Sequence, residues 1–283
     1  GGVVAMLRLH RNRSEQTLTK ALGMLEMRRK LKSDAVWREI TTQGLSFATL
    51  PGTAELHAAS LQNNDYLSVD TLGDVVAYER WGAIDPAHLL EMFPLERYRE
   101  WEKYRWEARA MVLDTLSRRT GRVVRFVNVI DWKGAGFGMR KIMSYAKEYV
   151  AGDATFTIPT SPEATFLVGV SSIATGIINT AKAAFFSESQ KRKTQIITGD
   201  PFRHSKDFAE RFDRTVMPAD VGGELSTGSD GHCCIGVDHT ALADNDFNIT
   251  TEHGELNTSY TFANEDDAEL LDKLTLLPAE VAA

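Results

Sequence analysis

The feature that most constrains this chain is a segment of helical length, Ile173–Phe186, that is apolar around most of its circumference. Thr175, Asn179 and Lys182 form one narrow polar stripe along it. A helix of this kind must be buried or face lipid. It is too short to span a bilayer, which takes about 20 residues. We therefore expect this segment to cover an apolar interior.

The segments on either side of this helix favour an α/β arrangement. A Pro162-Glu163 turn leads into a predicted strand, Thr165–Val170, and a basic loop, Gln190–Lys193, leads into another, Thr194–Thr198. The helical first third of the chain thus gives way to alternating strands and helices.

The rest of the chain agrees with an α/β fold. The cleanest strand pattern is Val123–Ile130, a near-continuous apolar run of the kind expected in a strand covered on both faces. Residues Gly44–Asp74 contain several turn signals, and we expect mostly loops there. The other predicted elements are a strand at Val75–Tyr78 and helices at Glu15–Leu31, Pro86–Glu91, Leu95–Arg118, Met139–Tyr149 and Lys206–Met217.

Charge divides the 283 residues into two unlike parts. Residues 226–283 hold twelve acids and one base, a net charge of −11, so residues 1–225 carry +4 of the overall −7. A mildly basic body can approach an anionic membrane surface, although a solvated acidic tail also explains the split. No motif indicates nucleic acid binding. The start, Gly1-Gly2, has neither a methionine nor a signal-peptide layout, and we expect a longer protein.

One turn requires a comparison with dinucleotide-binding proteins. A strand, the glycine-rich turn Gly134–Gly138 and a helix are the ingredients of the dinucleotide fingerprint. The spacing differs from that fingerprint, since Met139 occupies the third glycine position. Nucleotide binding is therefore a minor alternative.

No pattern indicates catalysis or a metal site. Cys233 and Cys234 are adjacent, which is a poor geometry for an ordinary disulfide, and no second ligand pair at zinc spacing accompanies them. The histidines have no paired spacing. We expect reduced thiols in a cytoplasmic protein that is not an enzyme and has no metal or cofactor.

The order of the motifs resembles the CRAL-TRIO lipid-transfer family, in particular its phosphatidylinositol/phosphatidylcholine transfer branch. The resemblance covers roughly Met6 to Leu225 and rests on these segments: MLRLHRNRSEQTLTKALGMLEMRRKL, VVAYERWGAIDPAHLL, VNVIDWKGAGF, SPE with the apolar helix, KRKTQII, and PADVGGEL. It implies an amino-terminal helical subdomain at 1–45, truncated at its start, and a lipid-binding lobe at 70–225. In that lobe, a mixed β-sheet floor is walled by helices around a hydrophobic lipid pocket. Residues 226–283 would form an acidic carboxy-terminal extension.

The resemblance also implies roles for individual residues. Ile173–Phe186 would be the mobile gate helix over the lipid. Three positions match residues that the family uses for the phosphatidylinositol head group: Arg13, Glu163 and Lys193. Without the resemblance, Arg13 also fits a surface charge at the end of a helix, and Lys193 also fits a solvated base in a loop. Phe126 and Asn128 stand where phosphatidylcholine-binding members have hydroxyl residues, and Asn128 can still hydrogen-bond a phosphate. The expected pocket and gate residues are Phe126, Ile173, Gly176, Ile177, Ile178, Ala181, Phe185 and Phe186.

The resemblance implies a monomeric lipid carrier. It would bind phosphatidylinositol as its ligand, contact membrane surfaces transiently and exchange or present the lipid there. An alternative from another class is a sensor or scaffold module that retains a lipophilic small molecule without transferring it.

Overall fold

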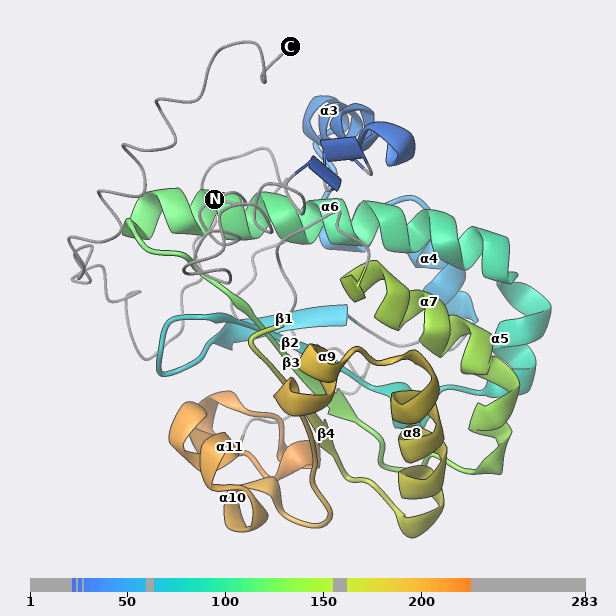
Figure 1. The fold of residues 1–283 in the computed structure, drawn as a ribbon, viewed down its shortest axis with the longest axis vertical. Coiled ribbons are helices and arrows are strands. Elements are labelled where there is room, and N and C mark those ends of the chain that lie inside the picture. Colours follow the sequence, from blue (N-terminus) through green and yellow to red (C-terminus); the bar gives the residue numbers. More distant parts are fainter. Residues whose placement is uncertain (1–21, 24, 27, 60–63, 155–161, 225–283) are drawn as a thin grey trace.

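The computed structural model describes residues 22–23, 25–26, 28–59, 64–154 and 162–224. Within them, five strands form one sheet in the order β1-β2-β3-β4-β5 (Figure 1). β1 runs antiparallel to β2, and β2 to β5 run parallel, so the predicted mixed sheet is confirmed. The strands are β1 (Asn64–Val69), β2 (Val75–Glu79), β3 (Phe126–Asp131), β4 (Ala164–Val168) and β5 (Thr194–Ile196).

Helices make each connection between parallel strands, as such crossovers require. α5 and α6 join β2 to β3, η3 and α7 join β3 to β4, and α8 and α9 join β4 to β5. No helix in the described part of the chain has both the length and the apolar character needed to cross a bilayer. The helices are α3 (Ser33–Gln43), η1 (Phe47–Thr49), α4 (Thr53–Ala58), η2 (Trp81–Ala83), α5 (Pro86–Met92), α6 (Leu95–Thr120), η3 (Phe137–Ile142), α7 (Met143–Ala154), α8 (Ser172–Phe185), α9 (Glu188–Lys193), α10 (Pro201–His204), α11 (Lys206–Arg211), η4 (Arg214–Val216) and η5 (Ala219–Val221).

The two faces of the sheet carry separate parts of the core. Side chains alternate between the faces of a strand, so Val127 and Val129 of β3 face one layer, where they pack with Phe208 of α11. Phe126 and Ile130 face the other layer, beneath the crossover helices. Figure 1 shows α10 and α11 on the side of the sheet away from α6, α7 and α8. Every residue of β3 is buried, as expected for a strand covered on both faces.

The strand predicted at Val123–Ile130 begins three residues later in the structure, at the start of β3. Two preceding backbone amides donate to side chains instead of to the ladder. The amide of Val124 donates to Ser117 Oγ at 2.9 Å, and that of Arg125 donates to Asp74 Oδ1 at 2.9 Å. These amides are therefore satisfied outside the sheet. The strand pairing begins only at Phe126, although the apolar run in the sequence begins at Val123.

The prediction of a basic loop at Gln190–Lys193 is wrong, since these residues end helix α9. The amide of Ser187 donates to the side-chain oxygen of Gln190 at 2.8 Å, and the amide of Gln190 donates to Ser187 Oγ at 3.3 Å. This reciprocal pair is a capping box, which stabilises the first turn of a helix. The predicted loop Gly44–Asp74 likewise contains η1, α4 and β1.

Two predicted helices are divided in the structure. Met139–Tyr149 corresponds to η3 followed by α7, and Lys206–Met217 corresponds to α11 followed by η4. The second division has a local cause, because the carboxylate of Asp213 accepts a hydrogen bond from Thr215 N at 2.9 Å and starts the new turn. α5, α6 and α8 lie within two residues of their predicted bounds. Residues 226–283 and most of the predicted Glu15–Leu31 helix lie outside the described residues.

A buried charged cluster joins α6 to β2. Arg105 Nη1 and Arg109 Nη2 each lie 2.9 Å from Glu79 Oε1, and Arg105 also pairs with Glu102 at 2.8 Å. Burial alone would raise the pKa of Glu79, but the two guanidinium groups hold that pKa below its ordinary value. The indole of Trp81 donates to Glu79 Oε2 at 2.8 Å. The cluster therefore fixes the end of β2 against α6.

We predict that Glu79→Ala lowers the free energy of unfolding by about 3–5 kcal/mol, because it leaves buried guanidinium groups without their counter-charge. Urea denaturation measures this difference. Glu55→Ala is the control, since Glu55 lies 2.9 Å from Arg97 but its side chain is 55% exposed, and a surface pair contributes about 1 kcal/mol or less. Equal losses in the two variants would contradict the prediction.

Candidate functional site

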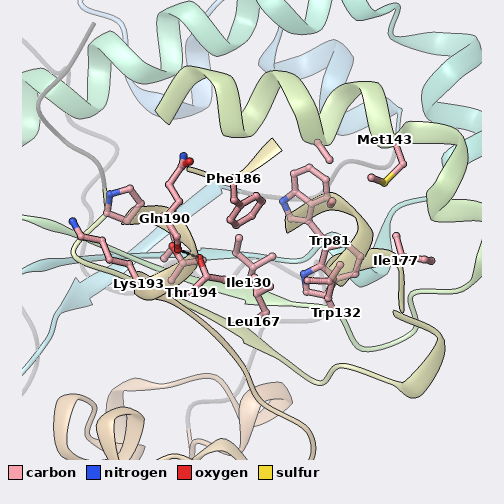
Figure 2. Close-up of a pocket in the computed structure, with 16 residues that line it drawn as sticks. Trp81, Ile130, Trp132, Met143, Leu167, Ile177, Phe186, Gln190, Lys193 and Thr194 are labelled. Atoms are coloured by element: carbon pink, nitrogen blue, oxygen red, sulfur yellow. Dashed lines mark hydrogen bonds between the residues drawn. The ribbon is translucent and has the colours of Figure 1, made fainter. Parts of the chain in front are cut away.

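A pocket of about 70 Å³ lies between the sheet and helices α7, α8 and α9 (Figure 2). Its floor comes from β3, β4 and β5, and its walls come from the helices. Most of the side chains that line it are apolar. The lining residues are Trp81, Asn128, Ile130, Trp132, Met143, Ala146, Pro162, Thr165, Leu167, Ile177, Ile178, Ala181, Phe186, Gln190, Lys193 and Thr194.

The register of the sheet arranges the floor in rows. Asn128 pairs with Thr165, and Thr165 pairs with Thr194, so three polar side chains cross β3, β4 and β5 as one row. Two residues further along, Ile130 pairs with Leu167. Residues two apart on a strand share a face, so both rows face the pocket. The floor therefore changes from polar to apolar along the strand direction.

Helix α9 adds polar groups at the polar row. Gln190 and Lys193 line the pocket there, and Gln190 is buried. The hydroxyl of Thr194 donates to Gln190 O at 2.7 Å, which ties the end of α9 to β5. Figure 2 shows Gln190, Lys193 and Thr194 together at one end, called here the polar end. A lysine ammonium and an amide can bind a phosphate or hydroxyl groups.

Two tryptophans form the opposite, aromatic end of the pocket. The rings of Trp81 and Trp132 are stacked, with centroids 6.1 Å apart and an angle of 24° between the planes. Figure 2 shows Met143 and Ile177 at the same end. Trp81 is held by its hydrogen bond to the buried Glu79, so the charged cluster supports this wall.

Helix α8 forms the outer wall. Ser171 caps it, since its Oγ accepts from Ala174 N at 3.2 Å. Ile177, Ile178 and Ala181 face the pocket and are buried. The other side of the helix is exposed and carries mainly small residues. These exposed residues are Gly176, Asn179, Thr180, Ala183 and Ala184.

A polar contact connects this wall to the sheet. The ammonium group of Lys182, on α8, donates to Thr194 O at 3.2 Å. Burial lowers the pKa of Lys182 from its ordinary value, and the charge of Lys191 lowers it further. The contact joins α8 to β5 at the polar end and closes the pocket there.

The structure brings most of the predicted pocket residues together. Phe126 is an exception, since it lies under α6, where the Arg109 guanidinium is 4.5 Å from its ring centroid. Gly176 is on the exposed side of α8, and no atom lies within 4 Å of the position of a Cβ there, so packing does not require a glycine at this position. Phe185 packs against the core beside the pocket without lining it. The predicted residues that line the pocket are Asn128, Ile177, Ile178, Ala181, Phe186 and Lys193.

Three predicted residues need separate mention. Arg13 and the side chain of Ile173 lie outside the described residues. Glu163 pairs with Arg125 at 2.7 Å, a contact that the sequence did not indicate. The cause is local, because Glu163 N donates to Phe126 O at 2.7 Å and holds this residue beside the start of β3.

Sequence reasoning missed several lining residues. Thr165 and Leu167 could have been found from the two-residue alternation of the predicted strand, which places both on one face. Trp132 was visible only as part of a turn motif, and its place in the pocket depends on the stack with Trp81. Met143 is the first residue of α7 and follows the 3₁₀ helix η3. Because a 3₁₀ helix has a different period from an α-helix, the pattern of the predicted helix did not place this side chain in the pocket.

A second cavity, of about 390 Å³, lies at the carboxyl ends of the strands. Asp200 and Asp220 line it, and they pair with Arg214 and Arg80 at 3.3 and 3.2 Å. In the residues that the structure describes, His, Cys, Asp and Glu side chains form no group of three or more that could hold a metal ion. Asp200 and Asp220, the two carboxylates of this cavity, are thus engaged in ion pairs and do not form a metal site with other described residues.

Comparison with known proteins identifies the fold. No family model and no curated protein match this chain. The solved structure titled "Crystal structure of Sfh5" matches with a TM-score of 0.50 and 17% sequence identity. The match covers 71% of this chain and 64% of that chain, less than two thirds of its length. This chain therefore has a CRAL-TRIO-like α/β fold, as the order of its motifs predicted.

We predict that Ala181→Phe blocks the pocket, because the added ring occupies a space of about 70 Å³. Binding of an apolar fluorescent dye should fall at least tenfold, while thermal unfolding shows a cost of about 1–3 kcal/mol from overpacking. Ala184→Phe is the matched control, because it adds the same ring on the exposed side of α8. Equal dye binding by the two variants would show that this pocket is not the binding site.

Proposed function

We propose that this protein is a non-enzymatic lipid carrier that binds phosphatidylinositol between the sheet and α8 and exchanges or presents it at membranes. In this way it would support phosphoinositide synthesis. The observation that carries the proposal is an apolar pocket with a polar end, closed by a helix whose outer side is exposed and carries mainly small residues. The CRAL-TRIO-like fold supports the same function.

The volume of the pocket supports a movable wall. Small-molecule sites commonly have volumes of about 300–1,000 Å³, whereas this pocket has about 70 Å³. Two acyl chains can enter only if a wall moves outward. α8 is the best candidate, because its exposed residues are small and its contact with β5 includes the single hydrogen bond of Lys182 to Thr194 O. Each methylene transferred from water to such a pocket contributes about 0.8 kcal/mol.

The polar end supports phosphatidylinositol over phosphatidylcholine. Asn128 is 1% exposed, and its Oδ1 accepts no hydrogen bond from any residue that the structure describes. A buried acceptor of this kind favours a ligand that donates. The hydroxyls of inositol are donors, while a choline head group has none. Lys193 can pair with the phosphodiester as a point charge.

Other parts of the proposal follow from the family resemblance. Arg13 and Glu163 complete the head-group site, with Glu163 exchanging Arg125 for an inositol hydroxyl when lipid binds. The protein acts as a cytoplasmic monomer that docks transiently on membranes. Its ligand is the lipid itself, without a cofactor.

A second candidate function is a sensor or scaffold module that retains a smaller lipophilic molecule. The small volume of the closed pocket favours this alternative. It predicts tight retention and no exchange between vesicles, whereas a carrier exchanges its lipid.

Two measurements separate these functions. Mass spectrometry of lipid that co-purifies with the protein from cells should identify phosphatidylinositol, and a transfer assay should show its movement between vesicles. Recovery of no lipid, or only of a sterol or tocopherol, would contradict the head-group proposal. Retention of a lipid without any transfer would favour the sensor or scaffold module.

We predict that Lys193→Ala lowers phosphatidylinositol transfer by about tenfold or more, since a hydrogen bond to a charged group contributes about 1.5–3 kcal/mol. Phosphatidylcholine transfer, if present, should change much less. Lys191→Ala is the control, because it removes the same charge from the same helix but from a residue that does not line the pocket. Equal loss for both lipids in Lys193→Ala would indicate a folding defect and contradict the assigned role.

A further inference from the structure

The aromatic end of the pocket contains a polar group that the proposed function leaves without a role. Trp132 is 9% exposed, lines the pocket, and its Nε1–H has no hydrogen-bond acceptor among the described residues. In Figure 2 this nitrogen lies on the edge of the ring that faces the middle of the pocket. A buried donor without an acceptor is costly, so its position in a ligand pocket is informative.

Two other buried indoles donate to acceptors within the protein. Trp81 donates to Glu79 Oε2 at 2.8 Å, and Trp101 donates to Thr53 Oγ1 at 3.0 Å. Trp132 is stacked on Trp81, within the same wall, but its donor points toward the cavity. The protein thus holds this ring firmly while its N–H stays available to the pocket.

The position of Trp132 along the strand direction determines where on a bound lipid a hydrogen-bond acceptor would lie. Asn128, Ile130 and Trp132 follow one another at two-residue intervals, with Ile130 and Leu167 forming the apolar row between the two polar groups. At about 3.3 Å per residue, the four steps along the chain from Asn128 to Trp132 span roughly 13 Å. The head group at the polar end therefore cannot itself reach the indole, and the apolar chain of the ligand passes between.

We propose that Trp132 Nε1–H recognises an oxygen on the acyl chain of the bound lipid, such as a hydroxyl, keto or ester oxygen, at a distance from the head group. This inference rests on the proposed function, since it assumes that a lipid occupies the pocket. It adds a specificity-determining residue and a ligand class: lipids with an oxygenated chain are preferred over those with a plain hydrocarbon chain.

The test compares oleic acid with ricinoleic acid, which differs from it by one mid-chain hydroxyl. Isothermal titration gives the ratio of their dissociation constants for three proteins: wild type, Trp132→Phe and Trp101→Phe. Wild type should favour ricinoleic acid, and Trp132→Phe should reduce this preference by about tenfold, since it removes the donor and keeps the aromatic surface. Trp101→Phe, which removes an indole N–H bonded to Thr53 at a residue that does not line the pocket, should keep the preference.

An unchanged preference in Trp132→Phe, or the absence of any preference in wild type, would overturn the inference and leave the lipid-carrier proposal standing. Failure of wild type to bind either acid would overturn the proposed function and the inference with it. Should Trp132→Phe not fold, indole N–H spectra of isotope-labelled wild type provide the second measurement. The Trp132 resonance should shift strongly with ricinoleic acid and little with oleic acid, and equal shifts would contradict the proposal.

Discussion

The register of β3, β4 and β5 determines what the pocket can bind. Because the strands are parallel and aligned, residues of one kind lie side by side: Asn128 beside Thr165 and Thr194, and Ile130 beside Leu167. A shift by one residue would turn every one of these side chains to the opposite face. The separation of a polar end from an apolar middle is therefore a property of strand pairing, and the helices above it only have to close the space.

The charged cluster beneath α6 has a second consequence besides holding β2. Burying Glu79 with Arg105 and Arg109 costs desolvation that the ion pairs offset only when their geometry is fixed. That fixed geometry extends to Trp81 through its hydrogen bond, and from Trp81 to Trp132 through the stacked rings. The aromatic end of the pocket is thus held in place, whereas α8, opposite the floor, is the wall that we propose to move.

Much of the fold was predictable because its signals are local. The apolar run of β3 and the pattern of α8 follow from periodicity, and the order of motifs predicted the CRAL-TRIO-like fold. The site was predicted in part. Lys193 and Asn128 line the pocket. Phe126 lies on the same face of β3 as Asn128, but two residues earlier along the strand, where it packs under α6 outside the pocket. Trp132 depends on a ring contact between distant segments, which no single-chain period reveals.

The central claim is that α8 is the wall that opens to admit lipid. Spin labels at Thr180 on α8 and Glu96 on α6, both exposed positions, allow its movement to be measured by pulsed electron paramagnetic resonance in a chain with Cys233 and Cys234 replaced by serine. Addition of phosphatidylinositol vesicles should produce a second population with a changed label-to-label distance. A single distance, unchanged by vesicles, would contradict a moving α8.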